Sequence, residues 1–230
     1  MTMQSQKIDS HHHFWQYTAA EYGWIDDTMS ALRRDFLPDD LRKEMQRAGI
    51  DGAVSVQARQ TIAETDWLLI LAERHDFIKG VVGWVPLISP GVEGVIERFA
   101  QHKKMKAVRH VLQDEPDDRY ILREDFNAGI FALAKHGLAY DILVFERHLP
   151  QTFQFVDRHP NQTSWTSPGP PPHFRECGAR KRRPLSDATS VVSAFTPFGV
   201  IRKILHLIME PVAISHIINL EGYTERTRGP

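Results

Sequence analysis

Residues 52–87 read GAVSVQARQTIAETDWLLILAERHDFIKGVVGWVPL and contain one strand–helix–strand unit. Two short runs rich in apolar and β-branched residues, at 52–57 and 78–85, are typical of buried strands. Between them, residues 62–74 have the amphipathic spacing of a helix. Strands that alternate with helices pair in parallel through right-handed crossovers. This part of the chain therefore predicts an α/β fold built on a parallel sheet.

The same unit recurs on both sides of residues 52–87. We expect further strands at residues 7–9, 105–112 and 138–144, and further helices at residues 39–48, 91–102, 123–135 and 149–158. The pattern fits either a doubly wound sheet or a (β/α)8 barrel. Because the strands begin about 33 residues apart, eight units would need roughly 260 residues or more. About five units fit before residue 162.

The composition changes at about residue 163. Eight of the 14 prolines follow that point, together with the single cysteine, Cys177, and the basic run at 180–183. Residues 163–230 hold nine Lys and Arg against five Asp and Glu, whereas residues 1–162 hold 19 against 24. The chain is therefore expected to divide into five strand–helix units at 1–162 and a Pro-rich, basic, poorly ordered tail at 163–230.

Three interpretations of this tail are open. It is a Pro-rich linker with a basic interaction patch, a small domain built on the apolar run at 200–220, or a segment translated out of frame. The first two are weak because the apolar run has no clear period or caps. Charged residues and a proline at 202, 203, 210 and 211 also interrupt it.

Charge and cysteine content limit the class of partner. The formal net charge is −1, so no overall field would draw the protein to nucleic acid or an acidic membrane. One cysteine excludes an internal disulfide framework and is typical of a reducing compartment. No run approaches the roughly 18 apolar residues of a membrane span. We expect a cytoplasmic protein that recognises a small molecule, with no nucleic acid and no membrane as partner.

The strongest local signal is the run Asp-Ser-His-His-His at residues 9–13, after the first expected strand. Alternate residues of a strand share a face, so His11 and His13 are expected to point in the same direction. Imidazole is the commonest metal ligand in proteins. The pair could therefore hold one metal ion or one substrate oxygen.

Polar residues also follow the later strands, where a purely structural strand would simply stop. They are Gln57, Arg59 and Gln60 after the second strand, Trp84 at the end of the third, Arg109, His110 and Gln113 at the fourth, and Asp141 on the fifth. Taken singly, each is more often a satisfied polar group or a solvated loop residue. In a parallel barrel, however, all of them converge on the carboxyl-terminal face, where active sites are built.

Six motifs between residue 7 and about residue 162 carry a family resemblance. They are IDSHHHFW, LRRDFLPDDL, VQARQTIAETDWLL, GVVGWVPL, VRHVLQDEPD and LAYDILV. In this order they resemble the L-fuconolactonase-like sugar lactonases of the amidohydrolase superfamily, relatives of 2-pyrone-4,6-dicarboxylate lactonase. The resemblance implies a (β/α)8 TIM barrel, here incomplete, that acts in carbohydrate metabolism by hydrolysing a sugar-acid lactone with an activated water.

The resemblance also implies roles for the candidate residues. His11 and His13 would lie at a metal or carbonyl site. Seven residues would bind the substrate, namely Gln57, Arg59, Trp84, Arg109, His110, Gln113 and Asp141. The motif VRHVLQDEPD has no lysine that could be carboxylated to bridge two metals, and Asp141 stands where many metal-dependent relatives place a histidine. The expected cofactor is either one divalent ion, zinc, or none.

Beyond residue 162 the sequence departs from the family pattern. The resemblance implies a sixth strand reading roughly L-D-H-x-x-K-P and an eighth carrying G-S-D-W-P, whose aspartate is the expected general base. Neither stands in this sequence. Trp165 has the single codon TGG and Thr166 begins with AC, so another reading frame contains GAC, an Asp codon, at the position of the sixth strand. We therefore favour a frameshift as the origin of the tail, and the catalytic residue is unassigned.

Two alternatives to an active lactonase follow. Without the strand-8 aspartate, the chain would be a truncated, catalytically inactive paralogue that still binds its ligand. The other alternative is a related metal-dependent decarboxylase of aromatic acids, but the motifs VQARQ and RHVLQDEP fit the lactonase branch better.

Overall fold

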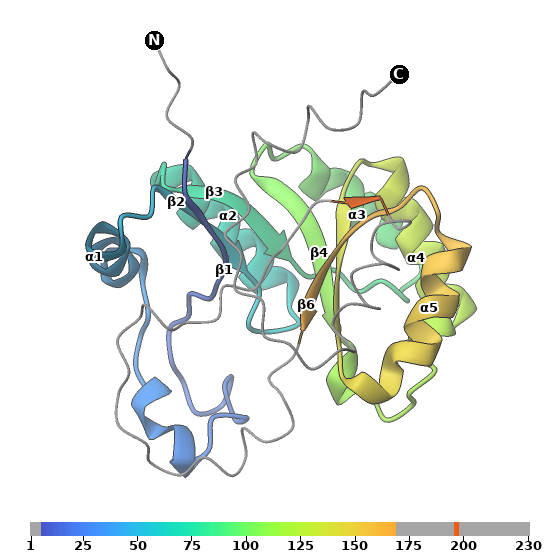
Figure 1. The fold of residues 1–230 in the computed structure, drawn as a ribbon, viewed down its shortest axis with the longest axis horizontal. Helices are drawn as coiled ribbons and strands as arrows, with labels where there is room; N and C mark the ends of the chain where they lie inside the picture. The colour runs from blue at the N-terminus through green and yellow to red at the C-terminus, as the bar shows by residue number, and fades with distance from the viewer. Residues whose placement is uncertain (1–5, 169–195, 198–230) are drawn as a thin grey trace, which may run out of the picture.

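The computed structural model describes residues 6–168 and 196–197 (Figure 1). The strands are β1 (Ile8–His12), β2 (Gly52–Val56), β3 (Ile78–Gly83), β4 (Met105–Val111), β5 (Ala139–Val144), β6 (Thr163–Pro168) and β7 (Thr196–Pro197). The α-helices are α1 (Pro38–Ala48), α2 (Ile62–Arg74), α3 (Val92–Ala100), α4 (Glu124–Lys135) and α5 (Leu149–Arg158). Short 3-10 helices are η1 (Asp27–Leu32), η2 (Leu112–Asp114), η3 (Tyr120–Leu122) and η4 (Glu146–His148).

The strands form one sheet in the order β1-β2-β3-β4-β5-β6-β7. Each pair from β1·β2 to β5·β6 is parallel, and β7 is antiparallel to β6. Figure 1 shows the strands side by side, with α1 and α5 at opposite ends of the molecule. The five expected strand–helix units are confirmed. The first strand was expected at 7–9 but runs to His12, because the polar histidines continue the extended backbone.

The structure differs at residue 163 from the prediction that a poorly ordered tail begins there. Thr163–Pro168, at the start of the segment predicted to be unrelated to the barrel, forms a sixth parallel strand. Its register with β5 runs from Tyr140↔Ser164 to Val144↔Pro168, so the edge of β5 is paired. The proline run, Cys177, the basic run and residues 200–220 lie outside the described residues, and their interpretation stays a prediction.

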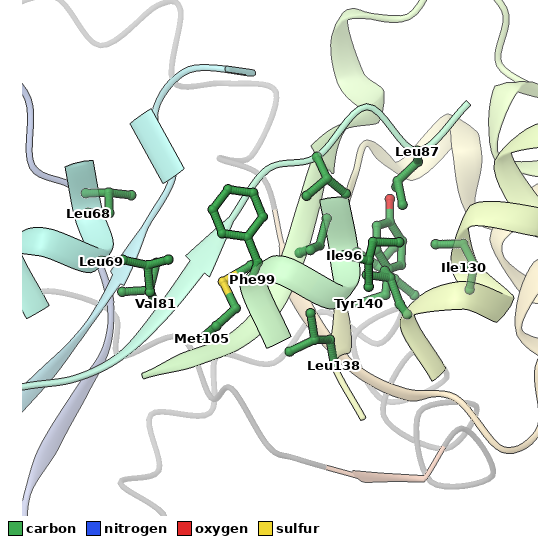
Figure 2. Packing of buried hydrophobic residues seen from close by; sticks show 14 of the residues in the cluster. Leu68, Leu69, Val81, Leu87, Ile96, Phe99, Met105, Ile130, Leu138 and Tyr140 are labelled. Atoms are coloured by element: carbon green, nitrogen blue, oxygen red, sulfur yellow. The ribbon is translucent and has the colours of Figure 1, made fainter. Parts of the chain in front are cut away.

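The two faces of the sheet pack differently. The face toward the helices carries the main hydrophobic core, part of which Figure 2 shows: Leu68, Leu69, Val81, Leu87, Ile96, Phe99, Met105, Ile130, Leu138 and Tyr140. The other face has a cluster of smaller residues: Val54, Val56, Val82, Ala107 and Ala139. Val81 and Val82 belong to different clusters because strand side chains alternate. Small residues on this second face suit the interior of a barrel, and we call it the inner face.

Local sequence sets the ends of the helices. Pro38 opens α1, and Gly49 closes it in the left-handed conformation, at φ 63°. Thr61 caps α2, because its hydroxyl accepts a hydrogen bond from the backbone N–H of Glu64. Among the described helices, none combines the length and apolar character needed to cross a membrane.

The connection between β1 and α1 has a small core of its own. Trp15, Tyr22 and Ile25 are buried together, and residues Tyr17, Met29, Leu32, Phe36 and Ala58 pack on them. Paired backbone hydrogen bonds of 3.1 and 2.9 Å join Trp15 to Phe36 and close the connection into a loop. The hydrophobic periodicity of the sequence did not predict this cluster, which packs against Ala58 just beyond the end of β2.

Candidate active site

His11 and His13 meet at the carboxyl-terminal end of β1, as the alternation of strand side chains predicted. Their Nε2 atoms lie 3.0 Å apart, and the rings are nearly perpendicular, at 78°. Nδ1 of His13 lies 2.9 Å from the backbone oxygen of Val56. Because a carbonyl oxygen only accepts, Nδ1 of His13 donates that hydrogen bond. In the neutral ring, Nε2 of His13 therefore presents a lone pair.

The environment keeps both imidazoles neutral. Burial, with a smaller contribution from the nearby Arg109 guanidinium, lowers the pKa of His11 to about 4. Burial and the same guanidinium lower the pKa of His13 well below its usual value. At neutral pH Nε2 of His13 can accept a proton or bind a cation, and Nε2 of His11 can do so in the tautomer that carries its proton on Nδ1.

Arg109 crosses the inner face of the sheet from β4. Its Nη2 donates to the backbone oxygen of Gln57 at 2.5 Å and to Gln57 Oε1 at 3.0 Å, and its Nη1 lies 3.3 Å from His11 Nε2. Arg109 shares the inner face with Ala107, two residues earlier on the same strand. The structure therefore brings Arg109, Gln57, His11 and His13 into one cluster, which we call the inner-face cluster.

Two buried donors of this cluster have no hydrogen-bond acceptor within the described part of the chain. They are Nε of Arg109, a residue that is 4% exposed, and Nε2 of Gln57, which is fully buried. A buried N–H without an acceptor is costly, so such atoms are the natural contacts for a bound ligand.

Asp141 balances the charge of Arg109. The two residues are direct partners in the register of β4 and β5, and Asp141 is buried. Burial lowers the pKa of Arg109, and the carboxylate of Asp141 opposes that shift. An arginine side chain stays protonated under these conditions, so the cluster contains a permanent buried cation.

Arg59 lies in a different network. It forms ion pairs with Glu21 and with buried Glu64, whose Oε1 is 3.7 Å from Arg59 Nε, and its guanidinium stands 5.3 Å from the centre of the Tyr22 ring. The structure therefore does not join Arg59 to the inner-face cluster through any described contact. Through these contacts Arg59 links the β1–α1 connection to the end of β2.

His110 faces the helices, because it follows Arg109 directly on β4 and so points to the opposite face. Its Nε2 lies 2.6 Å from Glu115 Oε1, and its ring stacks on Tyr120. Trp84 Nε1 donates to Nδ1 of His110 at 3.3 Å, which links the end of β3 to this residue.

Two further candidates bind backbone groups. Gln113 Nε2 donates to the backbone oxygen of Val144 at 3.4 Å, and Gln60 Oε1 accepts from the backbone N–H of Val111 at 2.8 Å. These contacts join neighbouring loops at the carboxyl-terminal face. A substrate-binding role for Gln113 stays a prediction.

The sequence reasoning missed Glu64, which is fully buried in the first turn of α2. Its Oε2 accepts from the backbone N–H of Arg59 at 2.7 Å and from that of Ala58 at 3.1 Å, which fixes the turn after Gln57. Burial raises the pKa of the Glu64 carboxyl, and its contacts with Arg59 oppose the shift. The pattern Thr-x-x-Glu at 61–64 signals a helix start, but not this contact.

The donor set of His11 and His13 fits part of a metal site. Two imidazole nitrogens that share one zinc ion at about 2.0–2.1 Å lie roughly 2.9–3.4 Å apart, and the observed separation is 3.0 Å. The hydrogen bond from His13 Nδ1 to a carbonyl oxygen is the usual support for a metal-bound imidazole. Within residues 6–168 and 196–197, however, no group of three His, Cys, Asp or Glu side chains could hold a metal ion.

The comparisons with known proteins point to one family. The family model described as amidohydrolase matches residues 8–164. An L-fucono-1,5-lactonase from Burkholderia multivorans is 42% identical over 160 residues, which cover 68% of this chain and 53% of that protein. An L-fucono-1,5-lactonase from Burkholderia ambifaria is 39% identical over 154 residues, which cover 67% and 53%. The chain spans about half the length of the curated relatives it matches.

A crystal structure of an amidohydrolase from Burkholderia multivorans with bound zinc superposes with a TM-score of 0.65 at 40% identity. The similarity covers 71% of this chain and 57% of that one. It confirms that the described strands and helices form an incomplete barrel of this type. The family match and the order of the five parallel strand–helix units lead to the same conclusion: the chain belongs to the amidohydrolase family.

Proposed function

We propose that this chain binds a small sugar-acid lactone of the L-fuconolactone type and hydrolyses it. The observation that carries the proposal is the inner-face cluster, in which Arg109, Gln57, His11 and His13 meet at the carboxyl-terminal ends of the strands. In barrels of this kind that end of the sheet holds the active site. The similarity to two L-fucono-1,5-lactonases suggests the substrate class.

The cluster suits the oxygens of a lactone. Arg109 Nε and Gln57 Nε2 are buried donors with no acceptor in the described chain, and a lactone offers carbonyl, ring and hydroxyl oxygens as acceptors. Hydrogen bonds that involve a charged group contribute about 1.5–3 kcal/mol each. Arginine is well suited to such contacts because its planar fork can bond two oxygens at once.

The same groups can support hydrolysis. Water adds to the lactone carbonyl carbon, negative charge develops on the carbonyl oxygen, and the ring C–O bond then breaks as its oxygen takes up a proton. The permanent cation of Arg109 would stabilise the developing charge. The neutral imidazoles of His11 and His13 can accept the proton that the attacking water loses. A zinc ion held by these two imidazoles would polarise the carbonyl or lower the pKa of a bound water.

One observation favours a second candidate, a chain that binds the lactone but turns it over slowly. The sequence after residue 162 contains no segment resembling G-S-D-W-P, which carries the expected general base of this branch. One general base commonly contributes about 10²–10⁴ in rate. In this case ligand binding to the inner-face cluster would persist while hydrolysis would be weak.

We further propose that the tail from residue 163 arises from a frameshift. The family model stops matching at residue 164, close to the change in composition. Sequencing of the gene tests this. An alternative open frame that encodes a G-S-D-W-P-like segment is expected, and its absence would contradict the frameshift.

Hydrolysis of a panel of sugar-acid lactones by the purified chain, with and without added zinc, tests the proposed function. Saturable hydrolysis of at least one lactone supports it. If calorimetry shows that the hydrolysed acid binds but no lactone is turned over, the second candidate is supported. If there is no binding and no turnover, both candidates are overturned. Release of CO2 from an aromatic hydroxy acid, in place of lactone hydrolysis, would favour the decarboxylase alternative.

A further inference from the structure

We propose that His110 is a positioning residue, which holds the indole of Trp84 in one orientation at the end of β3. The value of that orientation for catalysis rests on the proposed function, together with the substrate-binding role that the sequence predicts for Trp84. His110 itself lies on the helix side of β4, away from the inner-face cluster, and so acts through Trp84.

Both ring nitrogens of His110 have partners that fix its tautomer. An indole N–H can only donate, so Nδ1 of His110 accepts the 3.3 Å hydrogen bond from Trp84 Nε1. The carboxylate of Glu115 accepts, so Nε2 of His110 carries a proton and donates to it at 2.6 Å. One neutral tautomer satisfies both contacts, and rotating the ring by half a turn would break both.

Aromatic neighbours hold the ring of His110 in place. The Tyr120 ring stacks on it at a centroid distance of 5.1 Å and an angle of 5°, and the Phe126 ring meets it edge-on at 5.8 Å. His110 is 7% exposed. A side chain packed in this way keeps Nδ1 directed at the indole, which pre-organises the position of Trp84.

The backbone of Trp84 is fixed independently. Its N–H donates to Thr65 Oγ1 at 2.8 Å, and its carbonyl oxygen accepts from the same hydroxyl at 2.8 Å. Rotation of the indole about its own side-chain bonds is therefore the freedom that remains. The bond to His110 restricts that rotation, and the indole stays half-buried at the carboxyl-terminal face of the sheet.

Nuclear magnetic resonance of the indole N–H groups tests the inference without relying on activity. The chain has five tryptophans, and the variant Trp84→Phe identifies the signal of Trp84 by its loss. In the unaltered chain we expect a nitrogen–nitrogen coupling through the hydrogen bond between Trp84 Nε1 and His110 Nδ1. A His110 ring protonated at Nδ1 at neutral pH would overturn the proposal, and the coupling itself is measured in the unaltered chain.

Two substitutions separate positioning from simple packing. His110→Asn keeps an acceptor near the place of Nδ1, whereas His110→Leu fills the space without one. We expect hydrogen exchange at Trp84 Nε1 to rise by roughly tenfold or more in His110→Leu, and to stay close to the original rate in His110→Asn. The matched control His102→Leu removes another His–Glu contact, with Glu73 at 3.4 Å, and should leave the Trp84 signal unchanged.

Kinetics then connect the inference to the proposed function. With a lactone substrate, His110→Leu should raise KM severalfold with a smaller change in kcat, and His110→Asn should recover most of the loss. Equal exchange rates at Trp84 in the unaltered chain and His110→Leu would contradict the positioning role. If the resonance results hold but no lactone binds, the positioning role stands and the proposed function fails.

Discussion

Arg109 on β4 donates two hydrogen bonds to Gln57 at the end of β2, although β3 lies between their strands in the sheet. The acceptors are the backbone oxygen and the side-chain Oε1 of the same residue. A long side chain on the inner face can span this distance, and the register of β4 with β5 sets Asp141 beside it. The relationship brings the ends of three strands, β2, β4 and β5, into one polar cluster.

Gln57→Met should weaken this cluster while keeping its volume. The variant removes the 3.0 Å contact with Arg109 Nη2 and leaves a buried charged donor with one acceptor fewer. We expect the free energy of unfolding to fall by about 1–3 kcal/mol in urea titrations. Gln46→Met, at an exposed position of α1, is the control and should change it by less than about 0.5 kcal/mol. Equal effects of the two variants would contradict the assigned contact.

We expect Glu64 to stabilise the fold mainly because its oxygens accept hydrogen bonds, and less because of its charge. Glu64→Ala leaves the N–H groups of Ala58 and Arg59 without their acceptor and removes an ion pair of Arg59. We expect a loss of about 2–4 kcal/mol in unfolding free energy, whereas Glu64→Gln keeps an acceptor oxygen and should lose about half as much or less. If Glu64→Gln is as unstable as Glu64→Ala, the charge dominates instead.

Two glycines in helices should respond in opposite directions to alanine. A Cβ at Gly129 in α4 would lie 2.4 Å from the backbone oxygen of Leu87, whereas a Cβ at Gly94 in α3 would meet nothing within 4 Å. We expect Gly129→Ala to lower the melting temperature, at a cost of about 1–3 kcal/mol. Gly94→Ala should raise the melting temperature, through a gain of about 0.5–1 kcal/mol in unfolding free energy. A neutral Gly129→Ala would show that α4 does not approach Leu87 so closely.

Stability should fall as the pH drops from about 6.5 toward 4. Burial lowers the pKa of His11, His12 and His159 to about 4 in the folded chain, whereas an unfolded histidine titrates near 6.5. Between these values the unfolded chain binds more protons, so acid favours unfolding. Each such histidine contributes a slope of up to about 1.4 kcal/mol per pH unit. Urea titrations between pH 7 and pH 5 measure this slope, and a flat profile would contradict neutral buried histidines.

The sequence predicted the order and type of the five strand–helix units because hydrophobic periodicity reports them directly. It also predicted the meeting of His11 and His13, since strand alternation places residues i and i+2 on one face. The same rule predicts that Arg109 and His110 lie on opposite faces of the sheet, because they are consecutive and cannot both face inward. The sequence pattern alone did not predict which of these two residues faces inward.

Other features depend on contacts distant in sequence. The partners of Arg59 come from the β1–α1 connection and from α2, and the small cluster around Trp15 and Tyr22 that shapes this connection has no simple period. The sixth strand at Thr163–Pro168 is a further case, since the sequence assigns these residues to a poorly ordered tail, and their extended form comes with backbone pairing to β5.

The most direct test of the inner-face cluster as the substrate site is the rate of lactone hydrolysis, or of ligand binding, in Arg109→Lys. Lysine keeps the positive charge beside Asp141 but cannot make the two-point contact of the guanidinium. Arg98→Lys is the matched control, since Arg98 makes a two-point contact with Asp66 on the surface. We predict that Arg109→Lys lowers kcat/KM, or the affinity for the hydrolysed acid, by roughly tenfold or more, a loss of about 1.4 kcal/mol, while Arg98→Lys leaves both unchanged. Equal values for Arg109→Lys and the unaltered chain would contradict the central claim.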